Sequence, residues 1–264
     1  MSIKPRIAIP VPTSFDPDYN RRGWPQYARA VERFGGVPVE FPLDLTPRAI
    51  AELANTCQAI LLPGSPADVN PHKFGQDPIE ATAPADLPRE NVDELLLQDA
   101  HNLFKPILTI CFGTQMLNVW RTGTLVQDLT VMPVNHSASK VAVAHTALIP
   151  ADSLLGRIVG GDAEARAEAP EENGLLRLPV NSSHHQAVGI PGDALRVVAR
   201  CPQDAVVEAI EGGQGTAGLA HFVLGVQWHP ERSVESSASS RAIFARFLHE
   251  AAVWVPRPIL TSVV

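Results

Sequence analysis

The sequence predicts an α/β fold in which a mostly parallel central sheet carries helices on both faces. Short, continuously apolar runs alternate with amphipathic helical segments through the first half of the chain. Strands that are apolar throughout are typical of parallel sheets buried on both faces. The second half is rich in strand candidates. We therefore expect a single domain over residues 1–252, followed by an apolar, proline-interrupted tail over residues 253–264.

The first half supplies the alternating elements. Apolar runs predict strands at residues 7–11, 37–41, 59–62 and 106–110. Apolar residues at helical spacing predict helices at residues 24–34, 47–55, 90–104 and from 112 to about 120. Gly35 and Gly36 end the first of these helices, and Pro47 occupies the first turn of the second. A polar, proline-rich loop is expected between residues 67 and 89.

The second half is expected to be mostly strands. The candidates are residues 141–149, 179–180, 195–200, 206–210 and 222–227, with a last long helix over 235–252. Gly212, Gly213 and Gly215 lie between two of these strands and indicate a turn rather than a phosphate-binding loop.

Composition excludes several classes of protein. Hydrophobic residues make up 45% of the 264 residues and charged residues 19%, which is enough apolar material for a sizeable core. The 21 basic against 28 acidic residues argue against a nucleic-acid surface, which needs a clustered basic face. The sequence shows neither a signal-peptide pattern nor a membrane span. The three cysteines are far apart and form no CxxC pair, so neither a disulfide framework nor a zinc knuckle is indicated, and a cytoplasmic protein is expected.

Cys111 is the candidate nucleophile. It follows a buried strand and precedes a helix, with Thr109 two residues before it and Gly113 two residues after it. A sharp strand-to-helix turn requires small flanking residues, and it places the sulfur at the positive end of the helix. The alternative interpretation is a small core residue, which is the common fate of a free cysteine.

His229 is the candidate base for this nucleophile. It follows the apolar run at 222–227, and α/β enzymes place their sites at strand ends. In an extended segment, residues two apart point the same way, so Glu231 would lie beside His229 and Pro230 would stiffen the arrangement. A nucleophile, a base and an orienting carboxylate are the three members of a Cys-His-Glu triad. The alternative is a surface histidine in a turn.

The motifs together resemble a known family. Residues 110–115 read Ile-Cys-Phe-Gly-Thr-Gln and residues 229–231 read His-Pro-Glu, a pair of motifs similar to the class I glutamine amidotransferase-like superfamily. Residues 118–119, 123–129, 180–188 (Val-Asn-Ser-Ser-His-His-Gln-Ala-Val) and 207–211 extend the resemblance to the γ-glutamyl-γ-aminobutyrate hydrolase branch, a group of γ-glutamyl hydrolase-type peptidases. The resemblance covers residues 7–248 or so.

The resemblance implies a flavodoxin-like, three-layer α/β sandwich and hydrolysis of a small γ-glutamyl compound through a γ-glutamyl thioester, without a cofactor or metal. Cys111 would be the nucleophile, His229 the base and then the acid, and Glu231 the orienting residue. The residues expected to hold the oxyanion through backbone N–H groups are Phe112 and either Gly64 or Ser65. The expected substrate-binding residues are Gln115, Ser182, His184 and His185.

Three departures from the branch pattern concern the substrate. Residues 64–68 read Gly-Ser-Pro-Ala-Asp where Gly-Gly-Gly-Asp is usual, Phe112 stands where arginine is common, and Thr122-Gly123 replaces a Gly-Gly pair. Pro66 has no N–H and cannot donate to an oxyanion. With an apolar ring at position 112, a weaker preference for leaving amines that carry a carboxylate is expected.

His184 and His185 have side chains that could also ligate a metal. Adjacent residues of an extended chain face opposite ways, so at most one of the two should face the cleft. Since no ligand cluster with metal spacing accompanies them, no metal site is expected.

Two other functions remain open. One is a glutaminase subunit that delivers ammonia to a separate synthetase partner, and the other is a non-catalytic binding protein on the same fold. The apolar tail could pack on the body or on a partner, so a homodimer is one arrangement to consider.

Overall fold

A computed structural model describes residues 4–212 and 221–256 of the chain. Its centre is a ten-stranded sheet in the order β2-β1-β3-β4-β12-β11-β10-β6-β8-β7. The first five strands in this order are parallel, and the pairs from β12 onward are antiparallel. The sheet is thus mixed, with a parallel part contributed mainly by the N-terminal half and an antiparallel part from the strand-rich second half.

Most strand bounds are close to those expected from sequence. The strands expected at 141–149 and 179–180 are instead found at His145–Pro150 and Leu175–Val180, and the short strands Leu125–Val126, Glu171–Glu172 and Ala187–Val188 are additional to those expected. The parallel strands are β2 (Val37–Phe41), β1 (Arg6–Pro10), β3 (Ala59–Leu62), β4 (Ile107–Ile110) and β12 (Val223–Val226). The antiparallel strands are β11 (Val207–Gly212), β10 (Leu195–Arg200), β6 (His145–Pro150), β8 (Leu175–Val180) and β7 (Glu171–Glu172). A separate two-stranded sheet pairs β5 (Leu125–Val126) with β9 (Ala187–Val188).

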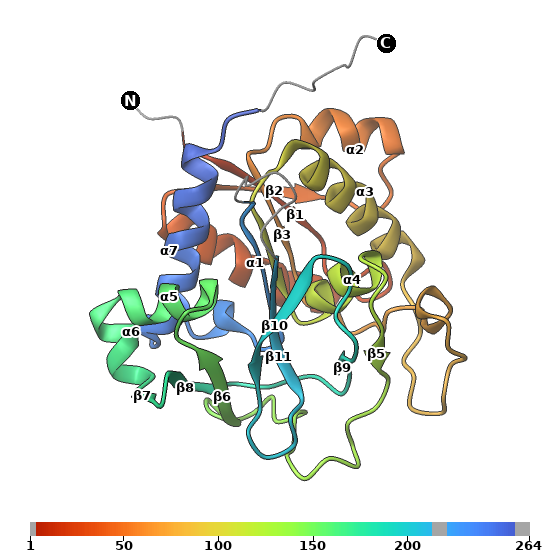
Figure 1. Cartoon of the computed structure of the whole chain (residues 1–264). Coiled ribbons are helices and arrows are strands. Elements are labelled where there is room, and N and C mark those ends of the chain that lie inside the picture. The colour runs from red at the N-terminus through yellow and green to blue at the C-terminus, as the bar shows by residue number, and fades with distance from the viewer. Residues whose placement is uncertain (1–3, 213–220, 257–264) are drawn as a thin grey trace, which may run out of the picture.

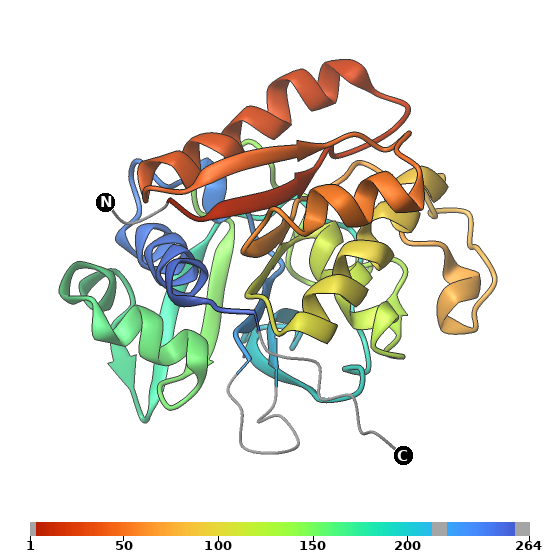
Figure 2. The same cartoon turned by 90° about the horizontal axis from the view of Figure 1, so that it is seen from above.

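Helices cover both faces of the large sheet (Figures 1 and 2). One face packs against α1 (Pro17–Arg33), α5 (Leu154–Gly161), α6 (Ala163–Glu168) and α7 (Ala238–Val253). The other packs against α2 (Pro47–Ala54), α3 (Leu87–Leu103) and α4 (Phe112–Trp120). Along β1 the buried side chains alternate between these cores, with Ile7 and Ile9 in the first and Ala8 in the second. The expected α/β sandwich is confirmed, including helices on both faces.

Several elements differ from the sequence expectation. Helix α1 begins at Pro17 rather than at residue 24, because the Asp16 side chain caps it by accepting from the Tyr19 N–H. The polar first turns carry no apolar periodicity, so the pattern predicted a late start. Helices α5 and α6 were not anticipated; they have eight and six residues, and α5 ends in two glycines.

The chain ends and the glycine-rich segment are only partly described. Gly212 is the last residue of β11, whereas Gly213 and Gly215 lie outside the described residues, so the expected turn there stays a prediction. Helix α7 runs to Val253, one residue into the expected tail. The Trp254 Nε1–H donates to the Leu103 carbonyl at 3.1 Å, so the start of the tail packs on the body of the protein. Within residues 4–212 and 221–256, no helix has the length and apolar character to cross a membrane.

Candidate active site

The carboxyl ends of three adjacent parallel strands carry the candidate active site. Leu62 of β3 pairs with Thr109 of β4, and Val226 of β12 pairs with Ile110 of β4. The residues that follow these strand ends therefore emerge side by side at one edge of the sheet. They include Gly64 after β3, Cys111 after β4 and His229 after β12. Strand order alone brings together residues far apart in sequence.

Cys111 lies in a strained turn between β4 and α4. Its φ of 52° and ψ of −111° fall in a region that residues other than glycine rarely adopt. Its N–H donates to the Val226 carbonyl at 2.9 Å, which fixes the turn against β12. Gly113 is required beside it, since a Cβ there would lie only 2.4 Å from the Leu62 carbonyl oxygen. The turn places Cys111 at the positive end of the α4 dipole, as the flanking small residues predicted.

His229 and Glu231 form a buried pair. The His229 Nδ1 and Glu231 Oε1 atoms are 2.8 Å apart, and each side chain is only 2% exposed. The expected extended segment is replaced by a 3₁₀ turn, η2 (Pro230–Arg232), which brings the same two side chains together by bending the chain. The Asn181 side chain holds the backbone of His229, because Oδ1 accepts from its N–H at 2.9 Å and Nδ2 donates to its carbonyl at 2.8 Å.

The charge state of His229 depends on its two neighbours. Burial lowers the pKa of His229, but the Glu231 carboxylate and the Cys111 thiolate outweigh it and raise that pKa to about 9. The imidazole is therefore protonated at neutral pH in the resting protein.

Gly64 lies between the nucleophile and the base. A Cβ at this position would lie 3.0 Å from His229 Cε1 and 3.5 Å from Cys111 Cβ. Cys111 and His229 thus both approach the same side of this backbone position. The Gly64 N–H donates to the Tyr27 hydroxyl at 3.0 Å. That donor therefore already has a partner within the protein.

The close approach at Gly64 leads to a testable expectation. Gly64→Ala should lower kcat/KM about tenfold or more, because the new methyl group would press on the imidazole carbon and displace it from Cys111. The steady-state kinetics of amide hydrolysis measure this effect. Gly161→Ala is the matched control, since nothing lies within 4 Å of a Cβ at that position. Wild-type kcat/KM in Gly64→Ala would contradict the close approach.

A cleft of about 290 Å³ opens beside Cys111. Among the expected site residues, Ser65, Phe112, Gln115, His184 and His185 line it with Cys111. Both adjacent histidines line the cleft, so the expectation that at most one of them faces it is wrong, and the two differ instead in burial and in their partners. The half-buried His185 ring contacts Asp68, with Nε2 and Oδ1 2.8 Å apart, and this hydrogen bond raises the pKa of His185. The His184 ring is 5% exposed and is held by the Gln186 carbonyl, which accepts from Nδ1 at 2.9 Å.

Two expected substrate-binding residues have structural partners. Gln115 lines the cleft, but its Nε2 donates to the Gln186 carbonyl at 3.0 Å and reaches Gln227 Oε1 at 3.4 Å. It therefore ties α4 to the 181–186 segment. The Ser182 hydroxyl is buried and donates to the His136 carbonyl at 2.6 Å. Ser182 lines a neighbouring hollow rather than the cleft at Cys111.

The Phe112 side chain does not form the cleft mouth. Its ring is 1% exposed and packs in a small apolar cluster with Met116 and Phe74. The Arg89 guanidinium carbon lies 4.9 Å from the ring centroid. The expectation of an apolar ring facing the leaving amine is therefore wrong, because the first turn of α4 directs this side chain into the protein.

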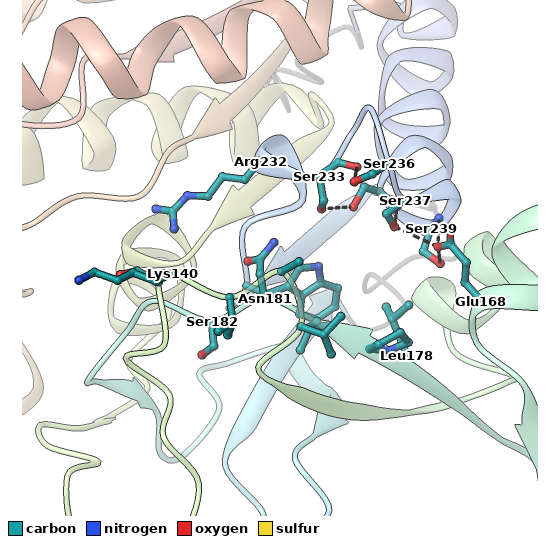
Figure 3. Close-up of a pocket in the computed structure, with 18 residues that line it drawn as sticks. Lys140, Glu168, Leu178, Asn181, Ser182, Arg232, Ser233, Ser236, Ser237 and Ser239 are labelled. Carbon is teal, nitrogen blue, oxygen red and sulfur yellow. Dashed lines mark hydrogen bonds between the residues drawn. The ribbon is translucent and has the colours of Figure 1, made fainter.

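Cationic side chains lie in the hollow next to the cleft (Figure 3). This hollow, of about 460 Å³, is lined by Lys140 and Arg232 on one side and by a row of serines with Glu168 on the other. Ser139 lines both the hollow and the cleft, so the two adjoin. Arg232 also lies beside the pair, with its Nε 3.5 Å from Glu231 Oε1.

Sequence reasoning assigned no role to several residues of the site. Tyr27 and Asn181 hold Gly64 and His229, and Tyr19 at the start of α1 lies close enough for the Cys111 charge to raise its pKa, together with burial. Asn181 belongs to the motif at 180–188, which could have pointed to it. Neither tyrosine had a local signal, because the start of α1 is polar and Tyr27 reads as an ordinary core residue.

Comparison with known proteins places the chain in a family. The model of the family described as Peptidase C26 matches residues 17–231. The chain belongs to the peptidase C26 family. This family member is 32% identical over 235 residues to γ-glutamyl-γ-aminobutyrate hydrolase PuuD of Escherichia coli (strain K12), covering 84% of each chain. It is 30% identical over 230 residues to the protein NtpR of Enterococcus hirae, covering 85% of this chain and 87% of NtpR.

Solved structures agree on the fold of this C26 family member. The glutaminase domain of CTPS from Trypanosoma brucei superimposes with a TM-score of 0.57 at 15% identity, covering 96% of this chain and 97% of that domain. A glutamine amidotransferase from Methylobacillus flagellatus gives a TM-score of 0.53 at 15% identity, covering 97% and 98% of the two chains. These likenesses establish a class I glutamine amidotransferase-like fold. The family and the fold together indicate a C26-type hydrolase.

Proposed function

We propose that the protein hydrolyses the γ-glutamyl amide bond of a small γ-glutamyl compound through a thioester on Cys111. The observation that carries the proposal is that Cys111, in its strained turn, and His229, paired with Glu231, approach the same backbone position at Gly64. The 32% identity to a γ-glutamyl-γ-aminobutyrate hydrolase supports the γ-glutamyl class of substrate.

Acylation begins from the thiolate–imidazolium pair. The Cys111 sulfur attacks the γ-carbonyl carbon, and the carbonyl π electrons move to oxygen. Backbone N–H groups of Phe112 and Ser65 would hold that oxyanion, and losing one such donor typically costs about 10²–10³ in rate. The Phe112 amide lies in the first turn of α4, where amides have no intrahelical partner.

Proton transfer follows from the change of charge on sulfur. In the tetrahedral intermediate the Cys111 sulfur is bonded to carbon and is neutral, so one of the charges that raise the pKa of His229 is lost. The imidazolium then becomes a stronger acid and protonates the nitrogen as the C–N bond breaks, which releases the amine.

Deacylation reverses these roles. The neutral His229 imidazole takes a proton from water, whose oxygen attacks the thioester carbon. Collapse of the tetrahedral intermediate breaks the C–S bond, releases glutamate and restores the thiolate–imidazolium pair. Glu231 holds the imidazole in one orientation through both steps.

The leaving amine is expected to extend toward the hollow of Figure 3. Lys140 and Arg232 lie there, so an amine with a carboxylate should gain a charge-assisted contact. We expect kcat/KM for γ-glutamyl-γ-aminobutyrate to exceed that for γ-glutamylbutylamide by about tenfold, or 1.4 kcal/mol. Measured amine release from this pair of substrates tests the expectation.

A substitution at Lys140 isolates the electrostatic contribution to the preference for a carboxylate on the leaving amine. Lys140→Met should reduce the preference for the carboxylate and leave kcat/KM for γ-glutamylbutylamide unchanged. Lys73→Met is the matched control, because Lys73 pairs with Glu90 and Glu94 away from the hollow. Equal kcat/KM for the two substrates in the wild-type protein would contradict this placement of the leaving amine.

The same two substrates, compared with glutamine, test the proposed function itself against the glutaminase alternative. Glutamine should be a poor substrate beside the γ-glutamyl amines. Hydrolysis of glutamine alone, rising when a copurifying partner is added, would replace the proposed function with that of an ammonia-delivering protein.

A further inference from the structure

Four buried side chains converge behind the cleft, outside the proposed triad. His136 lies in the segment between β5 and β6, His145 begins β6, His184 lies in the 181–186 segment, and Glu208 belongs to β11. Each is at most 6% exposed. One nitrogen from each histidine and one carboxylate oxygen lie within 4.8 Å of one another.

The distances between the side-chain atoms of these four residues are similar to those between the ligand atoms of a small metal ion. Glu208 Oε1 lies 3.2 Å from His136 Nδ1, 3.3 Å from His145 Nε2 and 3.8 Å from His184 Nε2. Tetrahedral zinc with bonds of about 2.0–2.1 Å to nitrogen and oxygen has neighbouring ligand atoms about 3.3 Å apart. The three distances from Glu208 Oε1 are close to this spacing, and all four atoms lie within 4.8 Å of one another.

Hydrogen bonds on the far sides of two rings fix which nitrogens face inward. His136 Nε2 lies 2.9 Å from Asp204 Oδ2, and His184 Nδ1 lies 2.9 Å from the Gln186 carbonyl oxygen. Both partners are acceptors, so these nitrogens carry the hydrogens. The inward-facing nitrogens, His136 Nδ1 and His184 Nε2, then lie 3.2 and 3.8 Å from Glu208 Oε1, and each offers a lone pair to a cation when its ring is neutral. Metal-binding histidines are commonly held in this way, with the outer N–H given to a carboxylate or carbonyl.

The inward-facing atoms lack hydrogen-bond partners. His136 Nδ1, His145 Nε2, His184 Nε2 and both oxygens of Glu208 have none in the described part of the chain. Buried polar atoms without partners are costly, and lone pairs directed at a carboxylate add repulsion. A proton placed between one nitrogen and the carboxylate would relieve a single contact, whereas a cation at the centre would relieve all of them.

We propose that His136, His145, His184 and Glu208 bind one divalent transition-metal ion, with zinc as the best match to three imidazoles and a carboxylate. Four protein ligands and full burial are typical of a structural rather than a catalytic site. Sequence reasoning about His184 found no neighbouring cluster, because the other three ligands come from separate segments that only the fold brings together.

The ion would hold one wall of the cleft. The His136 carbonyl accepts from the His184 N–H at 3.0 Å and from the Ser182 hydroxyl at 2.6 Å, so two ligands already belong to one packed unit. The Glu208 carbonyl accepts at 2.7 Å from the N–H of Gln227, shortly before His229. Binding at these ligands would therefore tie the 127–144 segment to the strands that carry the cleft.

The wild-type full-length chain, purified without a histidine tag, tests the proposal directly. Elemental analysis by mass spectrometry should find about one equivalent of transition metal per chain. Stripping with a strong chelator should lower the melting temperature by several degrees, and added ZnCl₂ should restore it. Cobalt(II) in place of zinc should produce the visible absorption typical of tetrahedral coordination.

Single substitutions test the ligand assignment. His145→Asn and Glu208→Gln should each lower metal content at least tenfold and remove the response of the melting temperature to zinc. His249→Ala is the matched control, because His249 is exposed on α7 and should leave metal content unchanged.

Two results would overturn the site. One is a folded wild-type protein that contains less than a tenth of an equivalent of metal and whose melting temperature does not respond to zinc. The other is wild-type metal content in both ligand variants. If the variants fail to fold, the metal content and zinc response of the wild-type protein decide the question alone.

Discussion

Cys111→Ala should lower kcat/KM for a γ-glutamyl amide by about 10⁴-fold or more, because no thioester can form without the sulfur. The substitution should change the melting temperature little, since one buried sulfur is removed and the turn is also fixed by the Cys111 N–H and by Gly113. Amine release and thermal unfolding measure the two effects. Full activity in this variant would exclude the proposed mechanism.

The other two cysteines are the matched controls. Cys57 is buried between α2 and β3 and Cys201 is buried just after β10, and Cys57→Ala and Cys201→Ala should keep wild-type activity where they fold. Burial raises the pKa of the Cys57 thiol and raises that of Cys201 to about 11. An iodoacetamide-type reagent should therefore label Cys111 first near neutral pH. Failure to label Cys111 selectively would favour a non-catalytic binding protein.

His229→Ala should lower kcat/KM by about 10²–10⁴-fold, the usual contribution of a positioned acid–base group. His229 moves a proton in both halves of the proposed reaction, whereas Glu231 only orients the imidazole and stabilises its protonated form. Glu231→Gln should therefore cost less activity than His229→Ala. Steady-state kinetics of the two variants, beside the wild type, measure this order. Equal activity of His229→Ala and the wild type would exclude His229 as the base.

The pH dependence of kcat/KM distinguishes an electrostatic role of Glu231 from a role in packing. The wild-type kcat/KM should fall as pH rises through about 9, because His229 then loses the proton that the leaving amine needs. The Glu231 carboxylate contributes to raising that pKa, so removing its charge lowers the pKa. In Glu231→Gln the alkaline limb should move to lower pH. An alkaline limb that stays in place in this variant would contradict the electrostatic role of Glu231.

Local pattern was enough to find most strands of the large sheet, most of the helices and the candidate reactive residues. The strands at 37–41, 59–62 and 195–200 have the expected bounds, because continuous apolar runs between turn residues are local signals. Cys111 could be singled out because the small residues that a strand-to-helix turn needs lie within two positions of it. The His229–Glu231 contact was also found, although a 3₁₀ turn rather than an extended segment produces it.

The alternation of elements and the identity of the proposed nucleophile and its acid–base pair follow from local sequence, since each depends on neighbours a few positions away. Packing between distant segments set the partner of the Gly64 N–H, the direction of the Phe112 ring, and the meeting of His136, His145, His184 and Glu208 in one buried cluster. These features depend on strand order and on packing between distant segments. Apolar periodicity reports whether a side chain is buried, but not which distant side chain it meets.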